Sequence, residues 1–135
     1  MQEKKSSVFI VATCNNIASL PPELLRKGRF DELFFVDLPE AAERQAIFAI
    51  HLSRHQQAPA NFALAGLAVA AEGFSGAEIA QAVTSALYSA FAQKSALTTE
   101  MILTEIHSTY PLSVTMKEKV ESLRAWARER AVPAN

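Results

Sequence analysis

Two short hydrophobic runs in the first forty residues predict buried β-strands. Residues 8–12 and 33–36 are continuous hydrophobic segments, rich in β-branched or aromatic side chains and too short for typical helices. Continuous hydrophobicity is typical of strands in a parallel sheet, because such strands are covered on both faces. Residues 20–26 lie between the runs and begin with a Leu-Pro-Pro sequence that suits a short helix. The order strand, helix, strand is therefore expected.

From residue 40 onward the hydrophobic residues recur at helical spacing. A first helix is expected over residues 40–54, with its apolar positions at Ala46, Ile47, Ile50 and His51 or Leu52. Residues 56–61, which contain Pro59, should form a connector. A second helix over residues 62–72 should end at Gly73, because glycine readily adopts the left-handed conformation that ends many helices.

The clearest local signal is a capping box. Ser75 and Glu78 have the required spacing, and Phe74 and Ile79 occupy the two positions of a hydrophobic staple. A third helix should therefore start at Ser75 and run to about Gln93. Its expected apolar face comprises Ala82, Val83, Ala86, Leu87, Ala90 and Phe91.

Two more helices are expected in the remaining residues. Thr98 or Thr99 should cap a fourth helix that extends through Ile106, and Pro111 should interrupt the chain. Thr115 and Glu118 form another capping-box pattern, which predicts a final helix to about Arg130.

Composition and charge narrow the class of protein. Of 135 residues, half are hydrophobic, enough for one domain or for one small domain and a piece of another. The 13 basic and 14 acidic residues nearly cancel, so nucleic acid is not an expected partner. The longest nearly uncharged stretch, residues 62–71, is about half of the roughly 20 residues that cross a bilayer, so no membrane partner is expected either. A single cysteine, Cys14, fits a reducing compartment, and a cytoplasmic location is expected.

Three motifs resemble one known family. Residues 8–16, VFIVATCNN, followed by residues 20–31, LPPELLRKGRFD, resemble the second half of an AAA ATPase core, and residues 73–78, GFSGAE, extend the similarity. The resemblance covers residues 8–92 in unbroken order. It implies an α/β fragment, the end of a P-loop NTPase parallel sheet, followed by an all-α AAA+ lid, so the chain should be predominantly helical. The implied division is a core piece over 1–39, a lid over 40–110 and a C-terminal helical extension over 111–135. That last part is similar to the ending of a stand-alone AAA group found in bacteria and plastids.

The resemblance assigns catalytic roles to three residues. Asn15 corresponds to sensor 1, whose neutral amide can hydrogen-bond a γ-phosphate oxygen and an attacking water. The alternative is an asparagine that only stabilises a turn, as expected for Asn16. Arg26 and Arg29 correspond to arginine fingers that reach the nucleotide of a neighbouring subunit. Here the alternative is a solvated basic surface.

Four further residues correspond to nucleotide-binding positions of the lid. Ile47 and His51, one helical turn apart, match positions that line the adenine and ribose pocket. A histidine on an apolar helix face can equally be an ordinary core residue. Gly76 and Ala77 occupy the place where other ATPases carry a cationic sensor 2, and their small size would let backbone approach the base and sugar. They could also simply permit a tight helix start.

Two motifs that ATP hydrolysis requires are missing from this sequence. The sequence contains no G-x-x-x-x-G-K-[ST] loop and no hydrophobic strand that ends in paired acidic residues. ATP and Mg²⁺ are thus expected in the full-length protein but not tightly bound to this chain, which alone should be inactive. The resemblance implies an ATPase of identical subunits in a ring, typically a hexamer, that acts on a protein substrate. The alternative is a non-catalytic helical module for protein binding or assembly.

Overall fold

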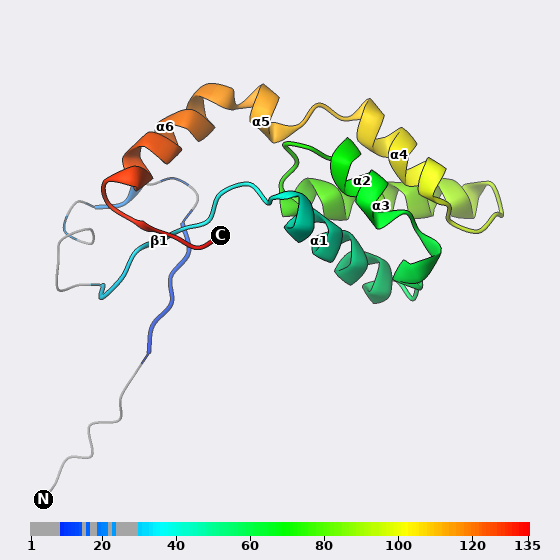
Figure 1. Cartoon of the computed structure of the whole chain (residues 1–135), viewed down its shortest axis with the longest axis horizontal. Coiled ribbons are helices and arrows are strands. Elements are labelled where there is room, and N and C mark those ends of the chain that lie inside the picture. Colours follow the sequence, from blue (N-terminus) through cyan, green and yellow to red (C-terminus); the bar gives the residue numbers. More distant parts are fainter. Residues whose placement is uncertain (1–8, 15, 17–18, 22, 24–29) are drawn as a thin grey trace, which may run out of the picture. The chain divides into compact units, whose positions relative to one another are not determined.

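The computed structural model describes residues 9–14, 16, 19–21, 23 and 30–135. The chain divides into two compact units, Met1–Leu33 and Phe34–Asn135. In the described residues, every α-helix and both paired strands belong to the second unit (Figure 1). The predicted class is confirmed, because the described chain is predominantly helical and its only sheet is a short parallel pair.

The elements of the second unit follow one another in a simple order. The helices are α1 (Ala41–Arg54), the 3₁₀ turn η2 (Pro59–Asn61), α2 (Leu64–Ala70), α3 (Gly76–Ala92), α4 (Thr99–Ser108), α5 (Leu112–Thr115) and α6 (Lys117–Arg128). The strands are β1 (Phe34–Phe35) and β2 (Val132–Pro133), which pair in parallel with Phe34 opposite Val132. Hydrophobic periodicity did not predict β2, because two residues are too few to show a period.

The strand predicted over residues 8–12 is not formed. Residues 9–12 have no regular structure, and Phe9 is 91% exposed. A parallel strand requires a neighbour for its N–H and C=O groups, and the described residues offer this segment none. Residue 8 and most of the helix predicted over 20–26 lie outside the described residues. The strand predicted over 33–36 is confirmed in part by β1.

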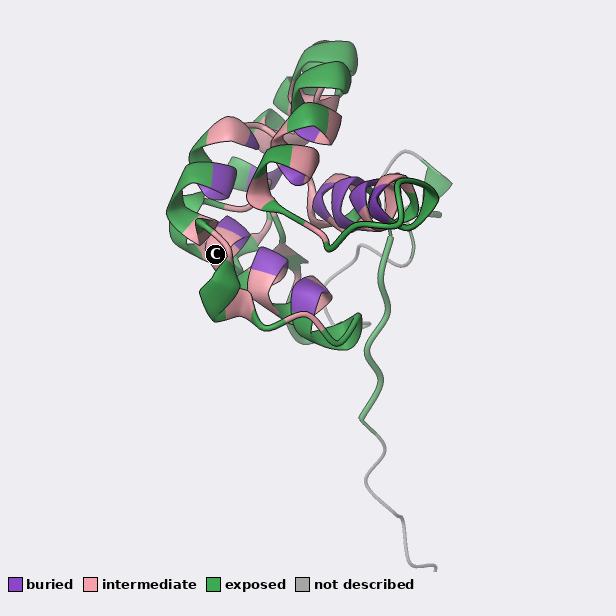
Figure 2. Ribbon diagram, turned by 90° about the vertical axis from the view of Figure 1, so that its right-hand side faces the viewer, coloured by how far each residue is buried: buried purple, intermediate pink, exposed green. Residues whose placement is uncertain are grey.

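Helices α1 to α4 pack around a hydrophobic core, in which α3 contacts both α1 and α4. Figure 2 shows the buried positions in purple, spread over several helices. The fully buried large side chains are Phe48, Leu52, Leu67, Ile79, Ile102 and Val83. The helical bundle predicted after residue 40 therefore has a hydrophobic core of its own.

Two predicted apolar faces need correction. In α1 the buried stripe is Arg44, Phe48 and Leu52, whereas Ala46 and Ile50 face solvent. In α3 the buried positions include Val83, Ala86 and Ala90, but Phe91 is 85% exposed. Successive residues of a helix point about 100° apart, so Phe91 lies beside the stripe on which Ala90 sits.

Two predicted helix starts are confirmed, and Gly73 adopts its predicted conformation although α2 already ends at Ala70. Ser75 caps α3, because its Oγ accepts the Glu78 N–H at 3.3 Å while the Glu78 carboxylate accepts the Ser75 N–H at 2.7 Å. Thr98 caps α4 by accepting the Met101 N–H at 3.3 Å. Gly73 has the expected left-handed conformation, with φ of 78°.

The capping box predicted at Thr115 and Glu118 is wrong. Thr115 is the last residue of α5, and its hydroxyl donates to the carbonyl oxygen of Pro111 at 3.4 Å. Helix α6 then begins at Lys117 without a side-chain cap. Because Pro111 starts a separate helical turn, the threonine side chain is used within that turn instead of at the start of the next helix.

Replacing Gly73 should destabilise the fold. Gly73→Ala would hold an L-residue in the left-handed region, and the Ser113 hydroxyl occupies the space that the new Cβ needs. We expect the free energy of unfolding to fall by about 1–3 kcal/mol. Gly66→Ala is the matched control, because Gly66 lies in α2, where a new Cβ would meet only the Ala63 Cβ at 4.0 Å, and the variant should gain about 0.5–1 kcal/mol. Urea unfolding followed by circular dichroism measures both, and equal stability of the two variants would contradict this interpretation.

Candidate functional site

The structure describes four of the seven predicted site residues. Ile47, His51, Gly76 and Ala77 lie in the unit Phe34–Asn135. Asn15, Arg26 and Arg29 lie outside the described residues.

Ile47 and Gly76 come together although 29 residues separate them in sequence. A Cβ built on Gly76 would lie 3.7 Å from Cδ1 of Ile47, which is ordinary van der Waals distance. Both residues are partly buried, and the neighbouring Ala77 is exposed. The middle of α1 and the first residue of α3 thus lie next to each other.

His51 lies one turn beyond Ile47 on α1 and is half-buried. Partial burial lowers the pKa of its imidazole below 6.5, and the nearby charges of Arg54 and His55 lower this pKa further. The ring is therefore mostly neutral at pH 7. A neutral imidazole can donate from one nitrogen and accept at the other.

The start of α3 is fixed by a single carboxylate. Glu78 accepts the Ser75 N–H and the Ser75 hydroxyl, each at 2.7 Å, through Oε2. Its Oε1 accepts the Leu112 N–H at 2.8 Å. The capping-box pattern identified the first contact, but no local signal indicated that Leu112 would bind the same side chain.

Arg44 fixes the connector that leads from β1 into α1, and sequence reasoning missed it. The side chain is buried, and its Nε donates to the Ala68 carbonyl at 2.8 Å while Nη1 donates to the Pro39 carbonyl at 2.7 Å. Arginine is seldom buried unless its donors are satisfied. The available signal was its spacing, because Arg44 lies four residues before Phe48 on the buried stripe of α1.

Two surface hollows of this unit lie elsewhere. One is lined by residues of β1, α6 and the C-terminal segment, and the other by residues of the connector, the turn before α3 and α5. Neither includes any of the four predicted nucleotide-binding residues.

Metal and membrane sites are not found in the described part of the chain. Among the described residues, no three His, Cys, Asp or Glu side chains gather as candidate metal ligands. None of the helices there has the length and hydropathy to span a lipid bilayer.

Comparison with known proteins identifies the family. Residues 1–38 match the model of the ATPase family associated with various cellular activities (AAA). The chain is 48% identical over 128 residues to the uncharacterized AAA domain-containing protein ycf46 of Pyropia yezoensis, covering 94% of this chain and 26% of that protein. It is 44% identical to the protein of the same name from Guillardia theta, with 94% and 25% covered.

A second group of relatives is more distant. The ATP-dependent zinc metalloprotease FtsH of Neorickettsia risticii is 39% identical over 99 residues, which cover 73% of this chain and 15% of that enzyme. The chain spans about a quarter of the length of its ycf46 relatives. The sequence motifs, the helical bundle and these similarities agree, and the chain belongs to the AAA ATPase family, as a C-terminal part of its ATPase module.

Proposed function

We propose that this chain completes an ATPase site in a ring of identical subunits. Asn15 senses the γ-phosphate, Arg26 and Arg29 reach the nucleotide of the neighbouring subunit, and the helical lid closes over adenine. The observation that carries the proposal is the contact between Ile47 on α1 and the position of Gly76 at the start of α3. Two segments that the family motifs assign to one pocket are thereby adjacent.

The chemistry of the lid residues fits adenine and ribose. Ile47 offers apolar contact, and the mostly neutral ring of His51 can stack on a base or exchange hydrogen bonds with it without introducing charge. Gly76 and the exposed Ala77 leave room for close approach to the backbone. Helix α3 holds this surface in place through the Ser75–Glu78 cap.

The exposed hydrophobic residues support a larger core sheet. Phe9, Ile10, Val11, Phe34 and Val36 are each at least 65% exposed. Large apolar groups at two segments predicted as strands are typical of surfaces that another part of a protein covers.

We assign residues 1–39 to the ATPase core, 40–110 to the lid and 111–135 to a C-terminal extension. The remainder of the parent protein would supply the neighbouring strands and the groups that hold the phosphates and Mg²⁺.

The arginines act electrostatically in this proposal. A guanidinium donates several hydrogen bonds and stays charged at all physiological pH values, so it stabilises negative charge that develops on a transferred phosphoryl group. When bound, Mg²⁺ neutralises charge between the phosphates. This chain contributes the arginines and the lid, not the metal ligands.

A second function has one observation in its favour. Tyr88 and Phe91 on α3 are 72% and 85% exposed, and aromatic residues are enriched where proteins contact one another. A non-catalytic module that binds a protein or assembles with other copies would use such a surface and would need no ATP.

Removing one arginine finger should stop turnover. We expect Arg29→Ala in the full-length protein to lower kcat by roughly 10³-fold or more while changing ATP affinity little, because the arginine stabilises the transition state of the neighbouring site. Lys27→Ala is the matched control, since it removes a nearby positive charge that has no assigned role. A steady-state ATPase assay with separate nucleotide titration measures both quantities. Wild-type turnover by Arg29→Ala would exclude the finger role.

The 135-residue chain alone should bind ATP weakly. It lacks the P-loop, so isothermal titration calorimetry should detect no micromolar affinity. Micromolar binding would show that the phosphates are held by residues of this chain and would contradict the proposed division of the site.

The protonation of His51 can be measured directly. In the folded chain its NMR titration midpoint should lie below 6.5, and Arg54→Gln should raise that midpoint by removing a neighbouring charge. Because the folded pKa is below the unfolded value, the unfolded state binds more protons as pH falls. The contribution of His51 to stability is therefore complete above about pH 6.5 and is lost as pH falls toward the lowered pKa. A midpoint at or above 6.5 would be inconsistent with a half-buried ring.

A further inference from the structure

We propose that residues 111–135 form a strap that fixes the connector between β1 and the lid. At one end the strap binds the start of α3, and at the other it binds residues 35–43 at the entrance to α1. This inference concerns the chain itself and does not depend on the ATPase function proposed above.

The first attachment is at the turn before α3. The Leu112 N–H donates to Glu78 Oε1 at 2.8 Å, across 34 residues of sequence. Next to Leu112, Ser113 lies directly against Gly73, so a side chain at position 73 would collide with the Ser113 hydroxyl. The beginning of the strap therefore packs on the same turn from which α3 starts.

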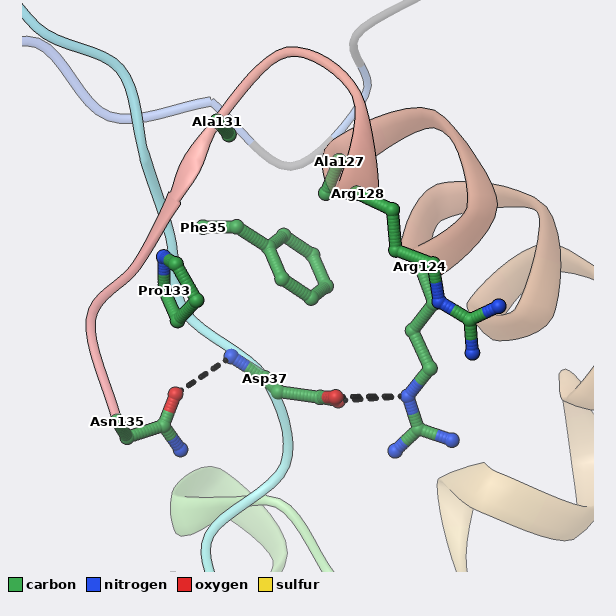
Figure 3. A pocket seen from close by; sticks show the side chains of 8 residues that line it. All are labelled: Phe35, Asp37, Arg124, Ala127, Arg128, Ala131, Pro133 and Asn135. Atoms are coloured by element: carbon green, nitrogen blue, oxygen red, sulfur yellow. Dashed lines mark hydrogen bonds and ion pairs between the residues drawn. The ribbon is translucent and has the colours of Figure 1, made fainter.

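The second attachment is centred on Asp37. Arg124 Nε on α6 donates to both carboxylate oxygens of Asp37, at 2.7 and 3.0 Å. Figure 3 shows the two side chains pointing toward each other. Partial burial raises the pKa of the Asp37 carboxyl, but the hydrogen bonds from Arg124 and from the Leu38 N–H, with the Arg124 charge, lower that pKa below its usual value. The hydrogen bond to Asp37 likewise raises the pKa of Arg124. Both shifts favour the charged pair.

The last residues of the strap bind the connector backbone. The Asp37 N–H donates to Asn135 Oδ1 at 3.0 Å (Figure 3). The Ala134 N–H donates to the Phe35 carbonyl at 2.9 Å. Asn135 Nδ2 also lies 3.3 Å from Glu43 Oε2, the oxygen that accepts the Glu40 N–H at the start of α1. The strap thus contacts the strand, the connector and the first helix of the lid.

Strand β2 is suited to be the outermost strand of a sheet. Because the Ala134 N–H points to β1, the nitrogen of the preceding Pro133 points the opposite way. Proline has no N–H, so this edge lacks one donor for a further strand. The strap can therefore add to one edge of β1 without offering a complete edge to another chain.

The attachments are individually weak and depend on one another. Arg124 and Asp37 side chains are 39% and 33% exposed, and ion pairs of that exposure contribute little alone. Here, however, Asp37 binds Arg124 through its carboxylate and Asn135 through its backbone. Losing either partner should loosen the other. The pair Lys117–Glu121 offers a contrast, because its atoms are 3.9 Å apart and both side chains are at least 60% exposed.

Amide hydrogen exchange in the 135-residue chain, followed by NMR, tests the strap. In Arg124→Gln and, separately, in Asn135→Ala, we expect the Asp37 and Ala134 amides to exchange at least about tenfold faster, since their partners are released. Exchange at Val83, inside α3, should not change. Glu121→Gln is the matched control and should leave Asp37 and Ala134 protected.

Two results would overturn the proposal. One is unchanged exchange at Asp37 and Ala134 in both variants, which would show that the strap does not protect the connector. The other is equal acceleration in Glu121→Gln, which would show that any loss of charge on α6 has the same effect. If Arg124→Gln also exposes Val83, Asn135→Ala alone decides, because it removes no charge and no core contact.

Discussion

The carboxylate of Glu78 is the contact on which the lid arrangement depends. It accepts the Ser75 N–H and hydroxyl on one oxygen and the Leu112 N–H on the other. An ionised carboxylate suits this task because it is acceptor-only and has lone pairs for several donors. Helix α3 contacts both α1 and α4, so the point at which it starts also sets where Gly76 meets Ile47. One side chain thereby positions the candidate nucleotide surface and the beginning of the strap.

The lid and its connector are held by different kinds of interaction. The bundle has an apolar core around Phe48, Ile79 and Ile102, which is non-directional and tolerates small shifts. The connector has no such core, and its backbone groups must find hydrogen-bond partners. Arg44 binds the Pro39 carbonyl, and Asn135 binds the Asp37 N–H. Directional bonds of this kind fix an orientation, which is the property required where a lid joins a sheet.

Because the chain belongs to the AAA family, these contacts can be related to a nucleotide site in the full-length protein. The chain spans about a quarter of the length of its ycf46 relatives, and its sequence contains no P-loop motif. Under the proposed function the lid surface at Ile47 and Gly76 would face a nucleotide held mainly by other parts of the protein. Contacts that orient the lid would then matter to catalysis without touching the reacting atoms.

Local interactions explain what the sequence alone determined. The cap at Ser75, the left-handed Gly73, helices α1 to α4 and the AAA motifs depend on residues close together in the chain, so spacing was enough to predict them. Tertiary structure alone decided that Phe91 is exposed, that residues 9–12 form no strand and that β2 pairs with β1. It also brought Arg124 to Asp37 across 87 residues, and buried Arg44 against carbonyl groups. Such contacts depend on where distant segments meet in space, and neither periodicity nor capping patterns contain that information.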